Sequence, residues 1–365
     1  MTQNEEISMK ETIKKIAVKG MYGFQTILNL GLGMRLGIFD YLFEKARSSS
    51  SGEKITSVSF TLEELSENLK LDLIYLDAWL HVGIECGIFE IDDSCERCAK
   101  TAANIFELLV DRDNMFYFGS TVKMFYKFAP YQDYFFEHFK TGKIENILET
   151  PSEDYKEGQE VSAAVGKINE RLFTKYCRND RKKIQQQGAI ILEVGCGYGY
   201  NLEIWANKYK KAKFIGIDID PNGVAHARDL VKQNNWSDRI EIFEMPLEEY
   251  IKTSDLKFDM VLLNEVLHEM NPDEKYRISV FENIYSLLKD DCILFVSESM
   301  IPDTFDTEKK EFQLFNVMHK SLEVAFGSRF YNEETFKNLV DLTPFEVENA
   351  EFIRERGNSF WKIRK

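Results

Sequence analysis

The feature that most constrains the fold is an apolar strand that runs directly into a glycine-rich turn. Residues 189–199 read Ala-Ile-Ile-Leu-Glu-Val-Gly-Cys-Gly-Tyr-Gly. Glycines at such a turn permit positive φ angles and let the backbone approach a ligand without a Cβ clash. A helix that follows the turn offers exposed N–H groups to a polar ligand. The spacing lacks the third glycine of the dinucleotide fingerprint, so the turn does not predict a dinucleotide.

Downstream of that turn, strand patterns alternate with helical patterns. The expected strands are residues 189–194, 213–217, 239–243, 258–263, 291–297, 345–352 and 358–364. The expected helices are residues 200–209, 221–234, 273–288 and 308–325. Such alternation is typical of parallel strands joined by crossover helices. The second half of the chain is therefore predicted to be an α/β domain with a Rossmann-like, mostly parallel seven-stranded sheet.

An acidic residue ends the second of these strands. Asp218 lies about 20 residues beyond the glycine turn, where a carboxylate can accept hydrogen bonds from both hydroxyls of a ribose. Asp220 precedes Pro221, and we expect it to cap the helix that begins there. The turn and Asp218 together predict a nucleoside-containing ligand.

The glycine turn and the strand that ends in Asp218 resemble the cofactor motifs of class I methyltransferases, which use S-adenosylmethionine. The resemblance implies that this cofactor is bound by Glu193, Gly195, Cys196, Gly197, Asp218, Ile219, Leu247 and Asn264. In that family the acid before the turn reaches the ammonium group of the cofactor. Met245 and Pro246 stand where relatives carry Gly-Asp. Adenine recognition is therefore expected to rest on backbone groups near Leu247, on Glu244 or on apolar packing.

A histidine follows the fourth strand, in the run Asn-Glu-Val-Leu-His-Glu-Met from Asn264. This run resembles a segment of the small-molecule O-methyltransferases, in which the histidine is the general base. The resemblance implies that His268 removes the proton of the acceptor, with Glu269 beside it and Glu298 orienting it. A neutral imidazole can take a proton, and a carboxylate can fix its tautomer. The alternative is that His268 only packs beneath the cofactor. A second glutamate of that family has no clear match near residues 327–331.

The N-terminal part of the chain is mainly helical. One helix is expected over residues 20–46, and Thr61 with Glu64 makes a capping box that opens a second. A third helix and a hairpin of residues 88–91 with 97–101 complete a winged-helix arrangement. It resembles the dimerisation domain of the same O-methyltransferases, so we expect a homodimer.

A winged helix can also read DNA, but the charges argue against nucleic acid as a partner. The third helix carries Asp72, Asp77 and Glu85 with no Lys or Arg, and the chain has a formal net charge of −15. Phosphate contacts would be poor. A regulator that senses S-adenosylmethionine and an inactive scaffold are the alternatives to an enzyme.

Three domain segments follow from these patterns. We expect a winged-helix dimerisation domain over residues 1–150, a helical connector over 151–187 and the methyltransferase domain over 188–365. Residues 105–140 are rich in Phe and Tyr. Flat acceptors favour aromatic walls, so we expect substrate binding by Tyr117, Phe118 and Tyr126. The alternative is that these rings form core between the domains.

Neither a membrane nor a metal is expected as a partner. No apolar run approaches the roughly 20 residues of a membrane-spanning helix, and the N-terminus lacks a secretory signal. The six cysteines are dispersed, which is typical of a reduced, cytoplasmic chain. Cys95 and Cys98 form a lone C-x-x-C pair, which we expect to be structural. Metal binding and redox chemistry are its alternatives.

The expected function is transfer of a methyl group from S-adenosylmethionine to a hydroxyl of a small molecule, with His268 as general base. The alternative is an N, S or C acceptor that is methylated by proximity without a base. The identity of the acceptor is not readable from the sequence, because one fold serves many acceptor pockets.

Overall fold

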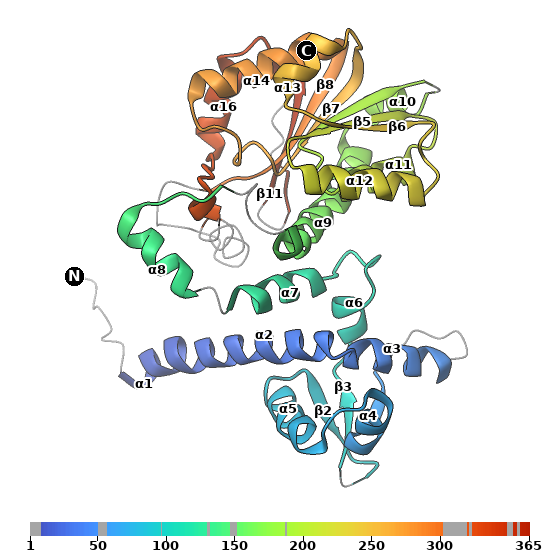
Figure 1. Cartoon of the computed structure of the whole chain (residues 1–365), viewed down its shortest axis with the longest axis vertical. Helices are drawn as coiled ribbons and strands as arrows, with labels where there is room; N and C mark the ends of the chain where they lie inside the picture. The colour runs from blue at the N-terminus through green and yellow to red at the C-terminus, as the bar shows by residue number, and fades with distance from the viewer. Residues whose placement is uncertain are drawn as a thin grey trace, which may run out of the picture. The chain divides into compact units, whose positions relative to one another are not determined.

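The structure is a computed structural model that describes residues 9–49, 57–95, 97–129, 132–146, 152–186, 188–301, 320, 323–348, 353–355 and 358–365. The chain divides into two compact units, Met1–Gln132 and Asp133–Lys365. Figure 1 shows the elements of both, coloured from the N-terminus to the C-terminus. Within the described ranges, no helix is long and apolar enough to cross a membrane.

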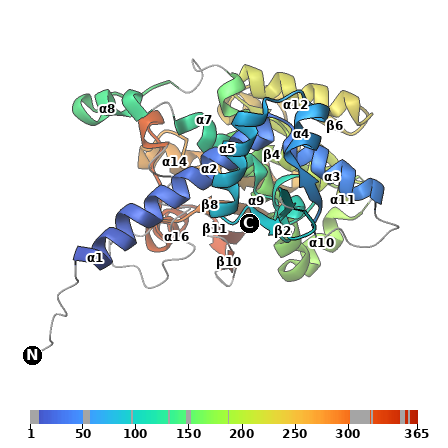
Figure 2. The same ribbon diagram turned by 90° about the horizontal axis from the view of Figure 1, so that it is seen from below.

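The first unit is mainly helical with one small sheet. Its helices are α1 (Met9–Thr12), the π-helix η1 (Ile13–Val18), α2 (Lys19–Arg35), α3 (Ile38–Ser49), α4 (Leu62–Leu69), α5 (Leu73–Glu85), α6 (Ile105–Leu109) and α7 (Gly119–Phe128). Its strands are β1 (Ser59–Thr61), β2 (Phe89–Asp92) and β3 (Cys98–Thr101), in the antiparallel order β1-β3-β2. Helix α5 packs against α2, as Figure 2 shows from below. The predicted pair of short helices and the hairpin are therefore present.

Side-chain caps set where the two short helices begin. The hydroxyl of Thr61 accepts a hydrogen bond from the N–H of Glu64 (3.1 Å) at the start of α4. The carboxylate of Asp72 accepts from the N–H groups of Ile74 and Tyr75 at the start of α5. Each cap satisfies N–H groups that have no partner within the helix.

Two expectations for the first unit are wrong. The single helix expected over residues 20–46 is broken between α2 and α3, because Gly37 takes a positive φ of 73° and ends the helical path. Cys95 and Cys98 form a disulfide at the end of the β2–β3 hairpin, so the thiols are not all reduced. Cys86 is free, as are the three cysteines of the second unit, Cys177, Cys196 and Cys292.

The second unit alternates helices and strands. Its helices are α8 (Gln132–Thr141), α9 (Ser152–Tyr176), α10 (Arg178–Ile184), α11 (Tyr200–Lys208), α12 (Pro221–Gln233), α13 (Leu247–Thr253), α14 (Glu274–Leu287), the 3₁₀ helix η4 (Val324–Phe326) and α16 (Glu333–Asp341). Its strands are β4 (Ile190–Val194), β5 (Lys213–Asp218), β6 (Ile240–Glu244), β7 (Phe258–Asn264), β8 (Leu288–Ser299), β9 (Glu346–Val347), β10 (Ile353–Glu355) and β11 (Asn358–Arg364). Most of the helix expected over residues 308–325 lies outside the described residues.

Among the described residues, the sheet of this unit has eight strands, one more than the expected seven. Its order is β10-β11-β8-β7-β4-β5-β6, and β9 pairs with β11. Strands β6, β5, β4, β7 and β8 are parallel neighbours, whereas β11 runs antiparallel to β8. The expected α/β class with a mostly parallel sheet is confirmed.

Helices cover both faces of this sheet, so the unit has three layers (Figure 1). Met260 and Leu262 of β7 pack with α9, α11 and α12 on one face. Val261 and Leu263 pack with α13, α14 and α16 on the other. Alternate side chains of one strand thus serve two cores, which explains why the strand reads as a continuous apolar run. The carboxyl ends of β4, β5, β7 and β8 meet at one edge, where polar residues replace the apolar ones.

Candidate functional site

The turn between β4 and α11 follows a backbone path that requires glycine at two positions. Gly195 and Gly197 have φ angles of 71° and 46°. A Cβ at Gly195 would lie 2.2 Å from Val266, and one at Gly197 would lie 2.5 Å from the amide oxygen of Gln159. A larger residue at either position would collide with the side chains that surround the turn.

Asp218 lies beside this turn at the end of β5. Its carboxylate accepts hydrogen bonds from the N–H groups of Gly197 (2.6 Å) and Asp220 (2.8 Å). Burial raises the pKa of Asp218, and these backbone bonds oppose the rise. Asp220 accepts from the N–H groups of Asn222 and Gly223, which confirms that it caps α12.

These elements enclose a pocket of about 300 Å³ at the carboxyl edge of the sheet, which we call the strand-edge pocket. All eight residues expected to bind the cofactor line it, namely Glu193, Gly195, Cys196, Gly197, Asp218, Ile219, Leu247 and Asn264. Other lining residues were not singled out from the sequence, among them Gln159, Tyr198, Tyr200, Asn201, Met245, Glu265 and Met270. Gln159 comes from α9, and no local pattern in the sequence shows that this helix passes the glycine turn.

The described lining of the strand-edge pocket is acidic. It includes the carboxylates of Glu193, Asp218, Asp220, Glu248, Glu265 and Glu269, and the described lining contains no Lys, Arg or His. Such a wall repels phosphate groups and stabilises a ligand that carries positive charge. The pocket is therefore unsuited to a pyrophosphate-bearing dinucleotide.

Glu193 is the most deeply buried of these acids, with 1% of its surface exposed. Its Oε1 accepts a hydrogen bond from Nδ2 of Asn201 (2.6 Å), and its Oε2 has no hydrogen-bond partner among the described residues. Desolvation raises the pKa of Glu193 to about 8, although the bond from Asn201 opposes the rise. The carboxyl group would ionise when a cation binds beside it.

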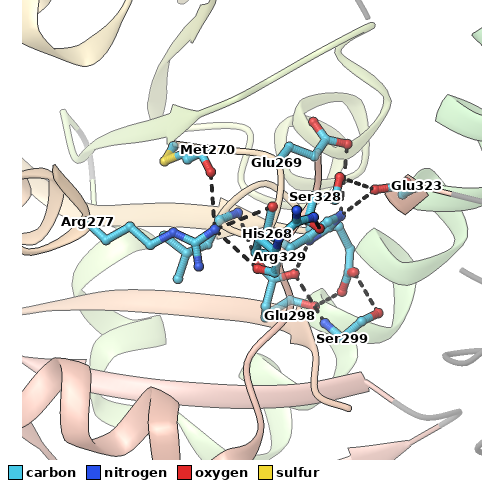
Figure 3. Close-up of polar contacts among 12 residues, drawn as sticks. His268, Glu269, Met270, Arg277, Glu298, Ser299, Glu323, Ser328 and Arg329 are labelled. Atoms are coloured by element: carbon cyan, nitrogen blue, oxygen red, sulfur yellow. Dashed lines mark hydrogen bonds and ion pairs between the residues drawn. The ribbon is translucent and has the colours of Figure 1, made fainter. Parts of the chain in front are cut away.

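His268 lies in the loop after β7, and its side chain is fully buried next to the pocket-lining Glu269. Its Nδ1 pairs with Oε1 of Glu298 near the end of β8, and the other oxygen of Glu298 accepts from the N–H of Leu267 (3.0 Å). Its Nε2 lies 3.1 Å from Oε2 of Glu323. Figure 3 shows the imidazole between these two carboxylates. The expected pair of His268 and Glu298 is thus brought together, and Glu269 lies farther away, at 4.0 Å from Nε2.

The two carboxylates determine the charge of this imidazole. Desolvation lowers the pKa of His268, but Glu298 and Glu323 raise it by more, so the pKa lies well above its usual value. The ring of Phe330 stacks on the imidazole with centroids 4.6 Å apart. His268 is not among the described residues that line the strand-edge pocket. In this arrangement Nε2 of the imidazole faces Glu323.

A buried arginine fastens the loop of His268 to the segment that carries Glu323. The guanidinium of Arg277 donates to the carbonyl oxygens of Met270 (3.1 Å) and Arg329 (3.2 Å). The N–H of Arg329 donates to the carbonyl oxygen of His268 (2.8 Å). These contacts are drawn in Figure 3. Arg277 and the backbone bond from Arg329 thus both connect the loop of His268 with the segment that carries Glu323.

Glu323 and Glu265 are residues of this region that the sequence did not indicate. Glu323 directly precedes η4 and takes the place beside His268 for which residues 327–331 offered no match. Glu265 follows β7 with a positive φ of 51°, and its carboxylate accepts from the hydroxyl of Ser299 (2.9 Å). Glu323 stands in no motif, and Glu265 lies in the run that contains His268 at a position to which the resemblance gave no role, so only the folded structure identifies them.

Two groups of side chains in this region could hold a metal ion. The ligand atoms of Glu265, His268 and Glu298 lie within 4.8 Å of one another, as do those of His268, Glu269 and Glu323. His268 already pairs with Glu298 and Glu323, so a metal would have to displace those contacts. The expectation that no metal takes part stays a prediction.

The three aromatic residues expected to bind the substrate lie in the first unit. Tyr126 of α7 fills the space over Gly31 of α2, where a Cβ would lie 2.5 Å from the tyrosine ring. The hydroxyl of Tyr117 accepts from that of Ser120 (3.4 Å), and Phe118 is 39% exposed. None of the three is among the described residues that line the strand-edge pocket, and their role stays a prediction.

Part of the second unit matches a known family. Residues 192–294 match the family model described as "Methyltransferase domain", and this range contains Glu193, Asp218 and His268. Over 91 residues the chain is 36% identical to ribosomal protein L11 methyltransferase of Shigella sonnei and 35% identical to that of Escherichia coli. These matches cover 25% of this chain and 29% of each relative. The chain thus spans less than a third of the length of the curated relatives it matches.

Solved structures share the fold over nearly the whole chain. The mitomycin 7-O-methyltransferase MmcR has a TM-score of 0.68 at 16% identity, covering 98% of both chains. The pyocyanin biosynthetic protein PhzM has 0.70 at 13%, covering 96% of this chain and 98% of its own. Human N-acetylserotonin methyltransferase, solved in complex with SAM, has 0.63 at 15%, covering 100% and 99%. The shared architecture is the Rossmann-like methyltransferase fold with an N-terminal helical region.

Proposed function

We propose that this chain, which carries a methyltransferase domain on the class I fold, transfers the methyl group of S-adenosylmethionine to a hydroxyl of a small molecule. The observation that carries the proposal is the buried pair of His268 and Glu298, placed near the ends of adjacent parallel strands and next to a residue of the strand-edge pocket. A base at this position suits a hydroxyl acceptor, whose proton must leave as the methyl group arrives.

The strand-edge pocket fits S-adenosylmethionine in its charge and its polar groups. This cofactor carries a sulfonium and an ammonium group and no phosphate, which suits a wall of carboxylates. Glu193 offers its Oε2 to the ammonium group, and Asp218 can accept the ribose hydroxyls. Ile219 and Leu247, which line the pocket, would supply apolar contacts to the adenine. When bound, the cofactor supplies an activated methyl group.

His268 acts in its neutral form. Its Nε2 takes the hydroxyl proton while the acceptor oxygen bonds to the methyl carbon, and S-adenosylhomocysteine is left as the second product. Glu298 keeps Nδ1 protonated and stabilises the imidazolium that forms. Because Nε2 faces Glu323 in the structure, the acceptor hydroxyl must take the place of that carboxylate before the proton can move.

An amine acceptor is the second candidate, and the charge of His268 favours it. Two carboxylates raise the pKa of this imidazole well above its usual value, which disfavours the neutral form that a base requires. A neutral amine attacks through its own lone pair and needs no base in the methyl-transfer step. Proximity within the site would then be sufficient for catalysis.

A methyl-transfer screen with isotopically labelled S-adenosylmethionine over phenols, amines and thiols tests the proposal, provided that the methylated atom of each product is identified. An O-methylated product whose formation requires His268 is the expected result. An N-methylated product that forms equally well with His268→Ala would establish the second candidate. Absence of cofactor binding would contradict both.

For the first unit we propose a winged-helix domain that forms a homodimer. Apolar side chains lie exposed along the first helical segment, including Met9 (74%), Ile16 and Met21 (67%). Exposed apolar surface of this kind is typical of protein–protein interfaces, and obligate dimers bury the most. Light scattering at micromolar concentration should give twice the mass of one chain, and the mass of a monomer would contradict the dimer.

The compartment we propose is the cytoplasm. Cys177, Cys196 and Cys292 are buried free thiols, which persist in a reducing compartment. Cys95 of the hairpin disulfide is exposed and thus accessible to cellular reductants. Rapid alkylation of thiols in intact cells should label both hairpin cysteines, whereas a stable disulfide there would indicate an oxidising compartment.

A further inference from the structure

Asn201 holds the buried carboxyl group of Glu193 without neutralising it. The two side chains both line the strand-edge pocket, and Asn201 is 5% exposed. Nδ2 of Asn201 donates to Oε1 of Glu193 at 2.6 Å. An amide carries no charge, so it can fix the direction of the carboxyl group and leave the charge available to a ligand. A Lys or Arg at this position would satisfy Glu193 internally.

The position of Asn201 depends in turn on a glycine of α9. A Cβ at Gly166 would lie 2.3 Å from Oδ1 and 3.1 Å from Cγ of Asn201. A real Cβ does not approach another atom so closely, so an alanine there would push the asparagine away. Gly158 of the same helix provides the contrast, because a Cβ there would meet nothing within 4 Å. Glycine is thus required in α9 at the position that faces Asn201.

One oxygen of Glu193 remains without a described partner once Asn201 has engaged the other. Oε2 is buried and has no hydrogen-bond donor among the described residues. The nearest charge that acts on Glu193 is the carboxylate of Asp218, and it carries the same sign. A buried acceptor without a donor is costly, so this arrangement is suited to a ligand that brings a cationic donor.

We infer that Asn201, packed against Gly166, is a positioning residue that directs Glu193 at the ammonium group of the cofactor and so makes the pocket prefer ligands with an amino-acid end. The inference rests on the proposed function. It assigns the preference to a contact between β4, α11 and α9 rather than to the glycine turn alone. The residues proposed to bind the nucleoside end of the cofactor, such as Asp218, do not contribute to this preference.

Two ligands that differ only at the amino-acid end test the inference. S-adenosylhomocysteine has the ammonium and carboxylate groups, and 5′-methylthioadenosine keeps the nucleoside and the thioether without them. Calorimetry with both ligands is compared for the wild type and for Asn201→Ala, Asn201→Asp and Gly166→Ala. Asn201→Asp keeps the shape of the side chain and loses its hydrogen-bond donor. It therefore still tests the inference if Asn201→Ala does not fold.

Each variant should bind S-adenosylhomocysteine about tenfold more weakly and 5′-methylthioadenosine as the wild type does, because one hydrogen bond to a charged group is lost. Matched controls are Asn207→Ala on the exposed side of α11 and Gly158→Ala in α9, and both should bind both ligands normally. Equal losses for the two ligands, or no loss for either, would overturn the inference. A wild type that binds neither ligand would overturn the proposed function itself.

Discussion

Two groups of buried and half-buried acids lie at the carboxyl edge of one sheet, and they are held in different ways. In the strand-edge pocket, Asp218 is held by backbone N–H groups and Glu193 by the amide of Asn201. In the other group, which we call the His268 cluster, Glu298 and Glu323 pair with the imidazole of His268. The acids of the pocket are therefore held by neutral groups of the chain, whereas those of the cluster are paired with an imidazole.

This difference assigns the two groups to separate tasks. Neutral donors orient a carboxylate and leave it attractive to a cationic ligand, so the strand-edge pocket is suited to binding. An imidazole between two carboxylates is a group with an adjusted pKa, so the His268 cluster is suited to proton transfer. Substitutions in one group should change affinity with little effect on chemistry, and substitutions in the other should do the reverse.

The largest effect is expected from His268→Ala. If a hydroxyl is the acceptor, loss of the base should lower kcat by roughly 10²–10⁴ while cofactor affinity stays close to that of the wild type. Glu298→Gln should lower kcat less, because the side chain keeps its shape. Single-turnover methyl transfer at saturating cofactor measures both, with the exposed His81→Ala of the first unit as control. Near wild-type turnover in His268→Ala would show that this residue is not a general base and serves only in packing.

The next largest effect is expected from Asp218→Ala, which acts on binding alone. Loss of the carboxylate that we propose accepts the ribose hydroxyls should weaken cofactor binding by roughly 1.5–3 kcal/mol. Calorimetry with S-adenosylhomocysteine measures this change, and Asp229→Ala on the exposed face of α12 is the matched control. Unchanged affinity in Asp218→Ala would contradict the proposal that the ribose binds at this edge of the sheet.

A smaller effect is expected from pH acting on Glu193. Its pKa of about 8 means that the carboxyl group is protonated at neutral pH in the free protein. The ammonium of the ligand favours the ionised form, so binding should release a proton, and affinity should rise about tenfold from pH 6 to pH 7. Calorimetry in buffers of different ionisation enthalpy counts the proton. The affinity should not rise with pH when Glu193→Gln binds S-adenosylhomocysteine, or when the wild type binds 5′-methylthioadenosine. A rise in either experiment would mean that the released proton comes from a group other than Glu193.

The smallest effect is expected from Glu323→Gln, which should move a pH profile rather than abolish activity. Glu323 is one of two carboxylates that raise the pKa of His268, so its neutralisation should lower that pKa. The base is then neutral at lower pH, and the rising limb of kcat should move toward acid by roughly one unit. Glu274→Gln, an exposed change at the start of α14, should leave the limb in place. If the rising limb of kcat does not shift in Glu323→Gln, then Glu323 does not influence the pKa of His268.

The α/β architecture could be predicted because its signals are local. Strands that are buried on both faces must be apolar at nearly every position, as residues 258–263 are, and the glycine turn after β4 needs residues that tolerate positive φ. The cofactor side of the site follows from the same signals, since Glu193 and Asp218 directly end two of these strands. Parallel strands bring such residues together without further information.

The remaining contacts depend on packing between distant segments, which a local pattern cannot show. Glu323 lies beside His268 in a region where Arg277 and the N–H of Arg329 connect the two segments that carry them. Gly37 breaks a helix in this chain, although an isolated glycine inside an apolar repeat is compatible with a continuous helix. The eighth strand was not predicted because β10 has only three residues, too few to show a strand pattern, whereas β9 lies within the strand expected over residues 345–352.

Helix α9 makes the cofactor-binding region longer than its motifs. Gln159 lines the strand-edge pocket, Gly166 makes room for Asn201, and the amide of Asn169 donates to that of Asn264 at 2.5 Å. A fragment that begins at residue 188 would keep every glycine and every acid of the motifs and still lack one wall of the pocket. Exchange of catalytic regions between this chain and its relatives would thus have to carry α9 along, so the segment that must be exchanged begins well before the first recognisable motif.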